Sequence, residues 1–299
     1  MANILLHIGF PKSGSTYLQK WFELHPEMYY QPKYIAQGFL NAWEVAKYAQ
    51  FNSSAPSNYI LSCEDLTLFQ SVRDRVGYRD TYDFNHRTFQ ENICNMLYDL
   101  FPTAKILIVT RGYTTLFTSI YSQYLAMAGA SKPQAFANAN QKLFTSMLDY
   151  DYVIDAYRKK FGSERVIILP YELMRDNRKL FLSLIEKEMN IHSPFEFEDR
   201  KINAAFDKKV LTAYQLISES VCKLISLFPR STQEKIYSQY AHLIRKDEPH
   251  FLPRLLSKLI NKPLQIDGVN TMVSDMKGKA ELLRNEPLYA PYLTEYLLT

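Results

Sequence analysis

Long apolar runs are missing from this sequence, and so are closely spaced cysteines and a strong excess of either charge. Its longest apolar runs, such as Ile106–Val109, are far too short to span a membrane. The N-terminus lacks the basic region and the long apolar region of a signal peptide. We therefore expect a soluble, cytoplasmic protein with no integral membrane segment.

The cysteines and the charge balance exclude further classes of protein. Cys63, Cys94 and Cys222 are odd in number and far apart, and they form no CxxC pair or Cys/His metal spacing. This pattern is typical of free, buried thiols in a reducing compartment. The 35 Lys and Arg against 31 Asp and Glu give a net charge of +4, which is small for a protein that coats nucleic acid.

Composition places the chain among globular proteins. Its 299 residues are 47% hydrophobic and 22% charged, and they suffice for one large α/β domain or two small ones. The 22 tyrosines and 18 phenylalanines stand against 2 tryptophans. Aromatic side chains fill the cores of sheet proteins, and they also line clefts that bind sugars and nucleobases.

Short apolar runs alternate with segments of helical periodicity over the first two hundred residues. This alternation predicts a parallel sheet covered by helices on both faces. We predict irregular structure over residues 27–58 and a surface loop over 70–87. The predicted strands are 3–8, 59–63, 105–110 and 165–169, and the predicted helices are 16–25, 89–101, 113–127, 152–161 and 178–189.

The strand signal disappears beyond about residue 205. Residues 210–227 and 232–244 have helical periodicity, and residues 249–299 carry repeated prolines. We predict an α/β core over 1–205 and a helical C-terminal extension over 206–299 that packs on it as part of one structural domain.

A loop rich in small residues joins the first predicted strand to the first predicted helix. Gly9 and Gly14 have the spacing of a Walker A loop, and Thr16 stands where that loop has Ser or Thr. Ser15 occupies the position of the Walker lysine, however, and the lysine appears earlier, as Lys12. Backbone amides at the start of the helix still predict an anion site, with a positive charge on its outer lip.

The segment Pro11–Gln19 (PKSGSTYLQ), followed by Trp21 and Phe22, resembles the 5′-phosphosulfate loop of sulfotransferases. That resemblance implies a three-layer, P-loop-like α/β fold and the donor 3′-phosphoadenosine 5′-phosphosulfate (PAPS), which leaves 3′,5′-ADP, with no metal required. It also implies that the donor's 5′ end is bound by five loop residues, namely Lys12, Ser13, Gly14, Ser15 and Thr16.

A second segment resembles the 3′-phosphate site of the same family. Ile106–Gly112 (ILIVTRG) is a strand that ends in Arg111, and Ser119 follows eight residues later. The resemblance implies that Arg111 and Ser119 hold the 3′-phosphate, for which a guanidinium offers two parallel donors. Gly112 and Tyr113 replace the Asn-Pro of many members. Val166–Leu173 resembles a third family segment, which we interpret as a strand and helix start more readily than as a direct site.

The reaction requires a group that stabilises the departing phosphate and a base for the acceptor hydroxyl. Lys12 fits the first task. Glu64 follows the second predicted strand. Carbohydrate-type sulfotransferases have a glutamate after this strand that acts as the general base, and the resemblance implies the same role for Glu64. His86 is the alternative base. Either side chain can instead be structural or solvated, and we interpret His7 as a core histidine. Asp149-Tyr-Asp151 matches a metal-binding DxD pattern but more readily begins a helix.

These features favour sulfation of a hydroxyl on a carbohydrate, such as a glycan or glycolipid, with no nucleic-acid partner. The reasons are Glu64, the Tyr-rich segment 27–58 and four arginines that form either a basic wall or a solvated loop, namely Arg73, Arg75, Arg79 and Arg87. A lipid or phenolic alcohol is the alternative acceptor. A P-loop kinase and a catalytically silent nucleotide-binding protein are the alternative functions.

Overall fold

The computed structural model describes residues 3–31, 58–63, 66–67, 85–195, 207–244, 251–265 and 273–298. Within them, five strands form one sheet in the order β2-β3-β1-β4-β5, and every neighbouring pair is parallel. The predicted α/β parallel sheet is therefore confirmed. The strands are β1 (Asn3–His7), β2 (Tyr29–Gln31), β3 (Asn58–Ser62), β4 (Lys105–Thr110) and β5 (Val166–Pro170).

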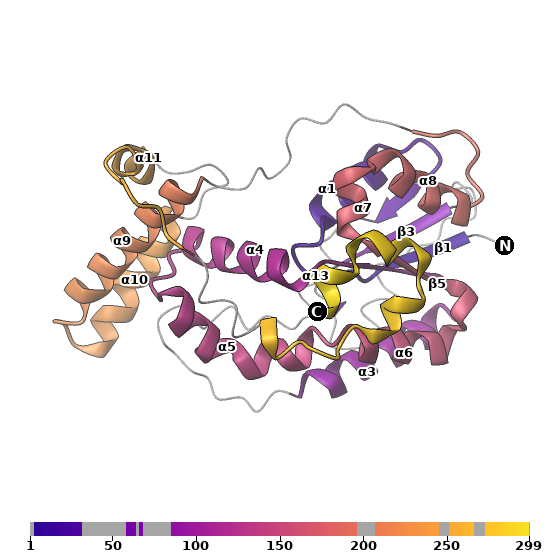
Figure 1. Cartoon of the computed structure of the whole chain (residues 1–299), viewed down its shortest axis with the longest axis horizontal. Coiled ribbons are helices and arrows are strands. Elements are labelled where there is room, and N and C mark those ends of the chain that lie inside the picture. The colour runs from indigo at the N-terminus through magenta and orange to yellow at the C-terminus, as the bar shows by residue number, and fades with distance from the viewer. Residues whose placement is uncertain are drawn as a thin grey trace.

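Helices cover both faces of this sheet (Figure 1). On β4, Leu107 and Val109 join the core that α1 (Ser15–Leu24) and α8 (Arg178–Glu188) complete. Their neighbours Ile106 and Ile108 face the opposite core, because successive side chains of a strand point to opposite faces. That second core is completed chiefly by α3 (His86–Leu100), α4 (Tyr113–Ala126), α5 (Pro133–Met147) and α6 (Tyr150–Phe161).

Three elements differ from the sequence prediction. β2 is an edge strand within the stretch predicted to be irregular, and it is too short to show a clear pattern. α5 occupies a stretch predicted to be polar, because Phe136 and Phe144 bury one face of an otherwise polar helix. α3 begins at His86 inside the predicted surface loop, because the Asn85 side chain caps it by accepting the Thr88 amide.

The C-terminal region is helical, as predicted, and it has two parts. We call residues 207–244 and 251–265 the C-terminal arm; they contain α9 (Lys208–Ile225), α10 (Arg230–Ile244) and α11 (Phe251–Ser257). Figure 1 shows these helices gathered at the end of the molecule away from the sheet. Residues 273–298 form a C-terminal tail that returns to the sheet, where η6 (Pro287–Tyr292) contacts β5 and α13 (Leu293–Leu297) contacts α4.

Two smaller observations complete the fold. Cys63 and Cys94 are buried, Cys222 is half-buried, and all three thiols are free, as predicted. Burial also raises the pKa of Cys94 to about 12. Within the described part of the chain, we find no helix whose length and apolar character would let it cross a lipid bilayer.

Candidate functional site

The loop between β1 and α1 has an unusual backbone at two positions. Lys12 has a φ of 63° and Gly14 a φ of 85°, so both lie in the left-handed region. Gly14 is also packed closely, since a Cβ atom there would lie 1.9 Å from Met174 Cε and 3.2 Å from Tyr171 Cδ2. Glycine is therefore required at position 14 both by conformation and by the approach of α7 (Tyr171–Asp176).

We expect Gly14→Ala to lower the unfolding free energy by about 2–4 kcal/mol, because left-handed strain adds to overpacking against Met174. Gly278→Ala is the matched control, since Gly278 has a φ of 78° but a Cβ atom added there would meet no atom within 4 Å. The control should show only the strain, about 1–2 kcal/mol. Chemical denaturation measures both; equal losses would contradict the packing argument.

The same loop has features that suit the binding of an anion. The Ser13 side chain is buried, and its Oγ atom has no hydrogen-bond partner among the residues that the structure describes. No side chain caps the N-terminus of α1, which begins at the buried Ser15 and continues with the exposed Thr16. An orphaned hydroxyl beside unsatisfied helix amides is suited to a phosphate group, which accepts hydrogen bonds and carries negative charge.

Arg111 brings the second predicted segment to this loop. Its Nη1 atom donates to the Lys12 carbonyl oxygen at 2.7 Å, across 99 residues of sequence. Its Nε atom donates to Thr115 Oγ1 at 3.2 Å, and its guanidinium carbon lies 4.4 Å from the centre of the Tyr171 ring. The structure therefore places the two segments side by side and holds the guanidinium between α4 and an aromatic face.

Ser119 lies on the same side of α4 as Thr115. The two residues are four apart, and side chains at that spacing are neighbours on a helix surface. Because Thr115 contacts Arg111, Ser119 is one turn further along the face that Arg111 meets. Thr115 was not predicted as a site residue, although it stands four residues after Arg111 in the sequence.

A buried polar network fixes the backbone around Arg111. Tyr150 donates its hydroxyl to the Arg111 carbonyl at 2.7 Å, and the fully buried Glu172 accepts the Gly112 amide at 3.0 Å. Tyr296, from the C-terminal tail, donates to the other Glu172 oxygen at 2.6 Å. Sequence reasoning missed this network, because tail residues more than a hundred positions away complete it.

A second carboxyl group from the tail lies beside this network. A Cβ atom on Gly112 would be 2.6 Å from Glu295 Cβ, so α13 passes directly over the backbone that follows Arg111. Burial, and then the neighbouring Glu172, raise the pKa of Glu295.

The structure describes only one of the two candidate bases. Glu64 lies outside the described residues. His86 is not in a solvated loop, as its surroundings in the sequence suggested; it is buried in the first turn of α3. Burial lowers the pKa of His86, because it disfavours the charged form of the ring.

The start of α3 lies close to the anion loop. Gln90, one turn beyond His86, donates to the Thr67 carbonyl at 3.0 Å, and Thr67 donates to the Gly9 carbonyl at 3.3 Å.

His7, predicted to be a core histidine, is buried, and its Nδ1 atom lies 2.7 Å from Ser62 Oγ.

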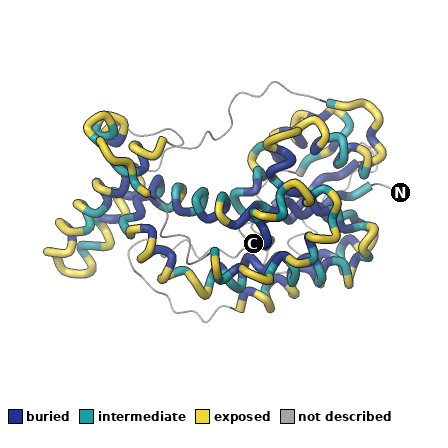
Figure 2. Tube along the Cα trace, viewed as in Figure 1, coloured by how far each residue is buried: buried dark blue, intermediate teal, exposed yellow. Residues whose placement is uncertain are grey.

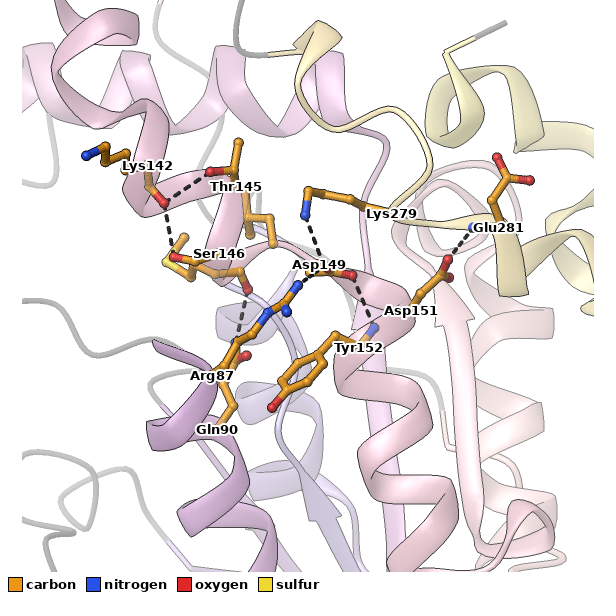
Figure 3. A network of polar contacts seen from close by, with 12 residues as sticks. Arg87, Gln90, Lys142, Thr145, Ser146, Asp149, Asp151, Tyr152, Lys279 and Glu281 are labelled. Atoms are coloured by element: carbon orange, nitrogen blue, oxygen red, sulfur yellow. Dashed lines mark hydrogen bonds and ion pairs between the residues drawn. The ribbon is translucent and has the colours of Figure 1, made fainter. Parts of the chain in front are cut away.

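The DxD-like segment begins a helix, as predicted (Figure 3). Asp149 is the N-cap of α6 and accepts the Tyr152 amide, while Asp151 accepts the amides of Glu281 and Leu282 in the tail. The second Asp149 oxygen accepts from Arg87 and from Lys279, each at 3.0 Å.

This network includes one of the four predicted arginines. Arg87 lies on α3, pairs with Asp149 and stacks over the Tyr152 ring at 4.8 Å, and its side chain is 53% exposed. Arg73, Arg75 and Arg79 lie outside the described residues.

Comparison with known protein families identifies the family of this chain. A sequence model of the sulfotransferase domain matches residues 3–186, which is more than half of the chain. The chain belongs to the sulfotransferase family. It therefore has the activity class of a sulfotransferase, in a family that generally uses PAPS.

Two solved structures are similar to this chain, and the first of them supports the fold. The crystal structure of a sulfotransferase from Alicyclobacillus acidocaldarius is similar to this sulfotransferase with a TM-score of 0.50 and 16% identity, over 78% of this chain and 99% of that chain. A mouse sulfotransferase solved as a complex with PAP gives a TM-score of 0.46 and 14% identity, over 99% of this chain and 88% of that chain. A search of curated proteins finds no match.

Proposed function

We propose that this sulfotransferase moves the sulfuryl group of PAPS to a hydroxyl of a carbohydrate or glycoconjugate by in-line displacement. The observation that carries the donor assignment is the 2.7 Å hydrogen bond from Arg111 Nη1 to the Lys12 carbonyl. It joins the anion loop, which follows β1, to the Arg111 guanidinium, which follows β4. A ligand with phosphates at its 3′ and 5′ positions could therefore reach the loop and the guanidinium together.

The residues present fit such a donor. Ser13 Oγ and the amides of Gly14, Ser15 and Thr16 would hold the 5′-phosphate, while Arg111 and Ser119 would hold the 3′-phosphate. When bound, PAPS supplies an activated sulfuryl group. Lys12 would place a positive charge on the lip of the loop, where negative charge grows on the leaving phosphate.

The test of the donor is a calorimetric titration of the whole chain in buffer without magnesium. We expect 3′,5′-ADP to bind and ATP to bind poorly, because ATP lacks the 3′-phosphate that Arg111 and Ser119 would recognise. Tight ATP binding that requires magnesium, with no binding of 3′,5′-ADP, would contradict the donor assignment.

The carbohydrate acceptor rests on Glu64 as the base. In the sequence Glu64 comes two residues after Ser62, the last residue of β3, and ligands of open parallel sheets bind at the carboxyl ends of the strands. The experiment is a screen of labelled PAPS with glycan, glycolipid, lipid-alcohol and phenolic acceptors. Transfer to glycans or glycolipids supports the proposal, and transfer only to phenols or simple alcohols contradicts it.

Glu64 and His86 can be separated by matched neutral variants. If Glu64 is the base, Glu64→Gln should lower turnover by ~10²-fold or more and remove the acidic limb of the pH–rate profile, since an amide cannot take the proton. Its affinity for 3′,5′-ADP should be unchanged. His86→Gln should then keep most of the activity, and the opposite result would assign the base to His86.

A melting curve on each preparation is the control. A Glu64→Gln protein that is destabilised but fully active per folded molecule would show that Glu64 is structural.

We further propose that residues 1–205 form the nucleotide-binding core and residues 206–299 an extension within the same structural domain. The contacts of the C-terminal tail support this division, because Tyr296 reaches Glu172 and Tyr289 lies 2.7 Å from the Thr110 hydroxyl in the core.

A further inference from the structure

The C-terminal arm exposes most of the large apolar side chains that this protein presents to solvent. Of twelve such side chains in the described residues, nine lie on α9, α10, α11 and their adjoining turns. The exposed fractions are 81% for Leu227, 75% for Leu259 and 73% for Phe251. Figure 2 shows the same end of the molecule largely in the colour of exposed residues.

Positive charge is concentrated on the same part of the chain. Residues 207–265 contain ten Lys and Arg and five Asp and Glu, a net charge of +5, whereas the rest of the chain contains 25 and 26, a net charge of −1. Residues 251–265 contain three basic residues and no acidic one. The positive net charge of the protein therefore comes from the arm.

Residues 251–265 combine both properties. Phe251 and Leu255 are exposed and four residues apart on α11, so they lie on one side of that helix, and Leu259 is exposed in the turn that follows it. Lys258 and Lys262 are also exposed, in the stretch after the helix. Pro253 is the buried residue of this helix, and the Leu264 amide donates to Thr212 Oγ1 on α9 at 2.7 Å. The segment is thus held on α9 with its apolar and basic side chains outward.

We propose that the C-terminal arm is a docking surface for an anionic lipid bilayer. Exposed Phe and Leu side chains interleaved with lysines are suited to the boundary between acyl chains and headgroups, where apolar groups insert and cations meet lipid phosphates. This proposal does not depend on the identity of the donor or acceptor.

A second copy of the chain fits this surface less well. A two-fold dimer would place the arm against itself, because the same patch is used on both subunits. Each arm carries a net charge of +5, so that contact would bring like charges together. The surface of an anionic bilayer is negative, so it attracts the basic arm, and the apolar side chains can insert into it in the same contact.

The test is flotation of the full chain with vesicles of phosphatidylcholine alone and with about one third phosphatidylserine, at ~0.05 M and ~0.5 M salt. We expect binding to the anionic vesicles at low salt and much weaker binding to the neutral ones. Salt should weaken binding, because it screens the lysines from the lipid charge.

Two double variants locate the contact. Phe251→Gln with Leu259→Gln removes apolar side chains, and Lys258→Gln with Lys262→Gln removes two charges. Each basic residue near an anionic surface contributes roughly fivefold in affinity, so the lysine pair should weaken binding by about 25-fold. Leu180→Gln and Lys187→Gln on α8 are matched controls, being exposed residues outside the arm, and should bind like the parent.

Melting curves confirm that each variant is folded, which is expected because the altered side chains are exposed. No binding to anionic vesicles at low salt would overturn the proposal, and so would binding that both arm variants retain. A dimer seen by light scattering that the Phe251 and Leu259 changes dissociate, without vesicle binding, would assign the surface to a second copy instead.

Discussion

Lys12→Ala should lower turnover by ~10²–10³-fold while the protein stays folded and keeps most of its affinity for 3′,5′-ADP. The reason is position: Lys12 lies in the anion loop three residues before the first residue of α1, and its backbone is left-handed with a φ of 63°. A donor aimed at charge that develops only during the reaction contributes to rate more than to ground-state binding.

The substitution leaves the surrounding contacts in place. Arg111 donates to the Lys12 carbonyl, which alanine retains, and alanine has much the same left-handed strain as lysine. Lys20→Ala is the matched control, because Lys20 is exposed on α1 and only pairs with Glu23. The measurement is the initial rate of each variant with saturating PAPS. If the rate of Lys12→Ala lies within threefold of the rate of Lys20→Ala, Lys12 has no catalytic role.

Arg111→Ala should weaken binding of 3′,5′-ADP by tenfold to a hundredfold and change binding of 5′-AMP far less. The lost partner is the 3′-phosphate, and a hydrogen bond to a charged group contributes ~1.5–3 kcal/mol. Titration calorimetry with the two nucleotides on one preparation measures the difference directly.

Two further variants distinguish binding from stability in this experiment. Arg111→Lys keeps the charge but loses the planar fork, so it should recover only part of the affinity. Arg178→Ala removes a comparable arginine–tyrosine contact, 4.7 Å from the Tyr17 ring, outside the proposed phosphate site. Equal losses of 3′,5′-ADP and 5′-AMP affinity in Arg111→Ala would place Arg111 outside the 3′-phosphate site.

The sequence was sufficient to predict the elements whose signals are local. β4 is a run of apolar residues buried on both sides, and it was predicted with its observed bounds. Gly162 ends α6 with a φ of 89°, as a glycine in that position indicates. Short or polar elements gave weaker signals: β2 has three residues, and α5 buries one narrow face of a polar helix.

The candidate site divides in the same way. The loop that contains Lys12 and Gly14 could be identified from its residues, because their spacing between a strand and a helix is a local property. The environment of Arg111 could not, since it depends on contacts with Tyr171 and with the Lys12 carbonyl across the fold. The burial of His86 was missed for the same reason, because its polar neighbours in the sequence do not show which distant segments of the chain cover it.

By itself, the sequence determined the four longer strands, the anion loop and the resemblance that names the enzyme family. All of these depend on side chains within a few residues of one another. Only the tertiary structure decided that Glu172 and Tyr296 brace the backbone beside Arg111, and that Phe251 and Leu259 are exposed. Burial and long-range hydrogen bonds are properties of the folded chain, because they arise when segments far apart in the sequence exclude water together.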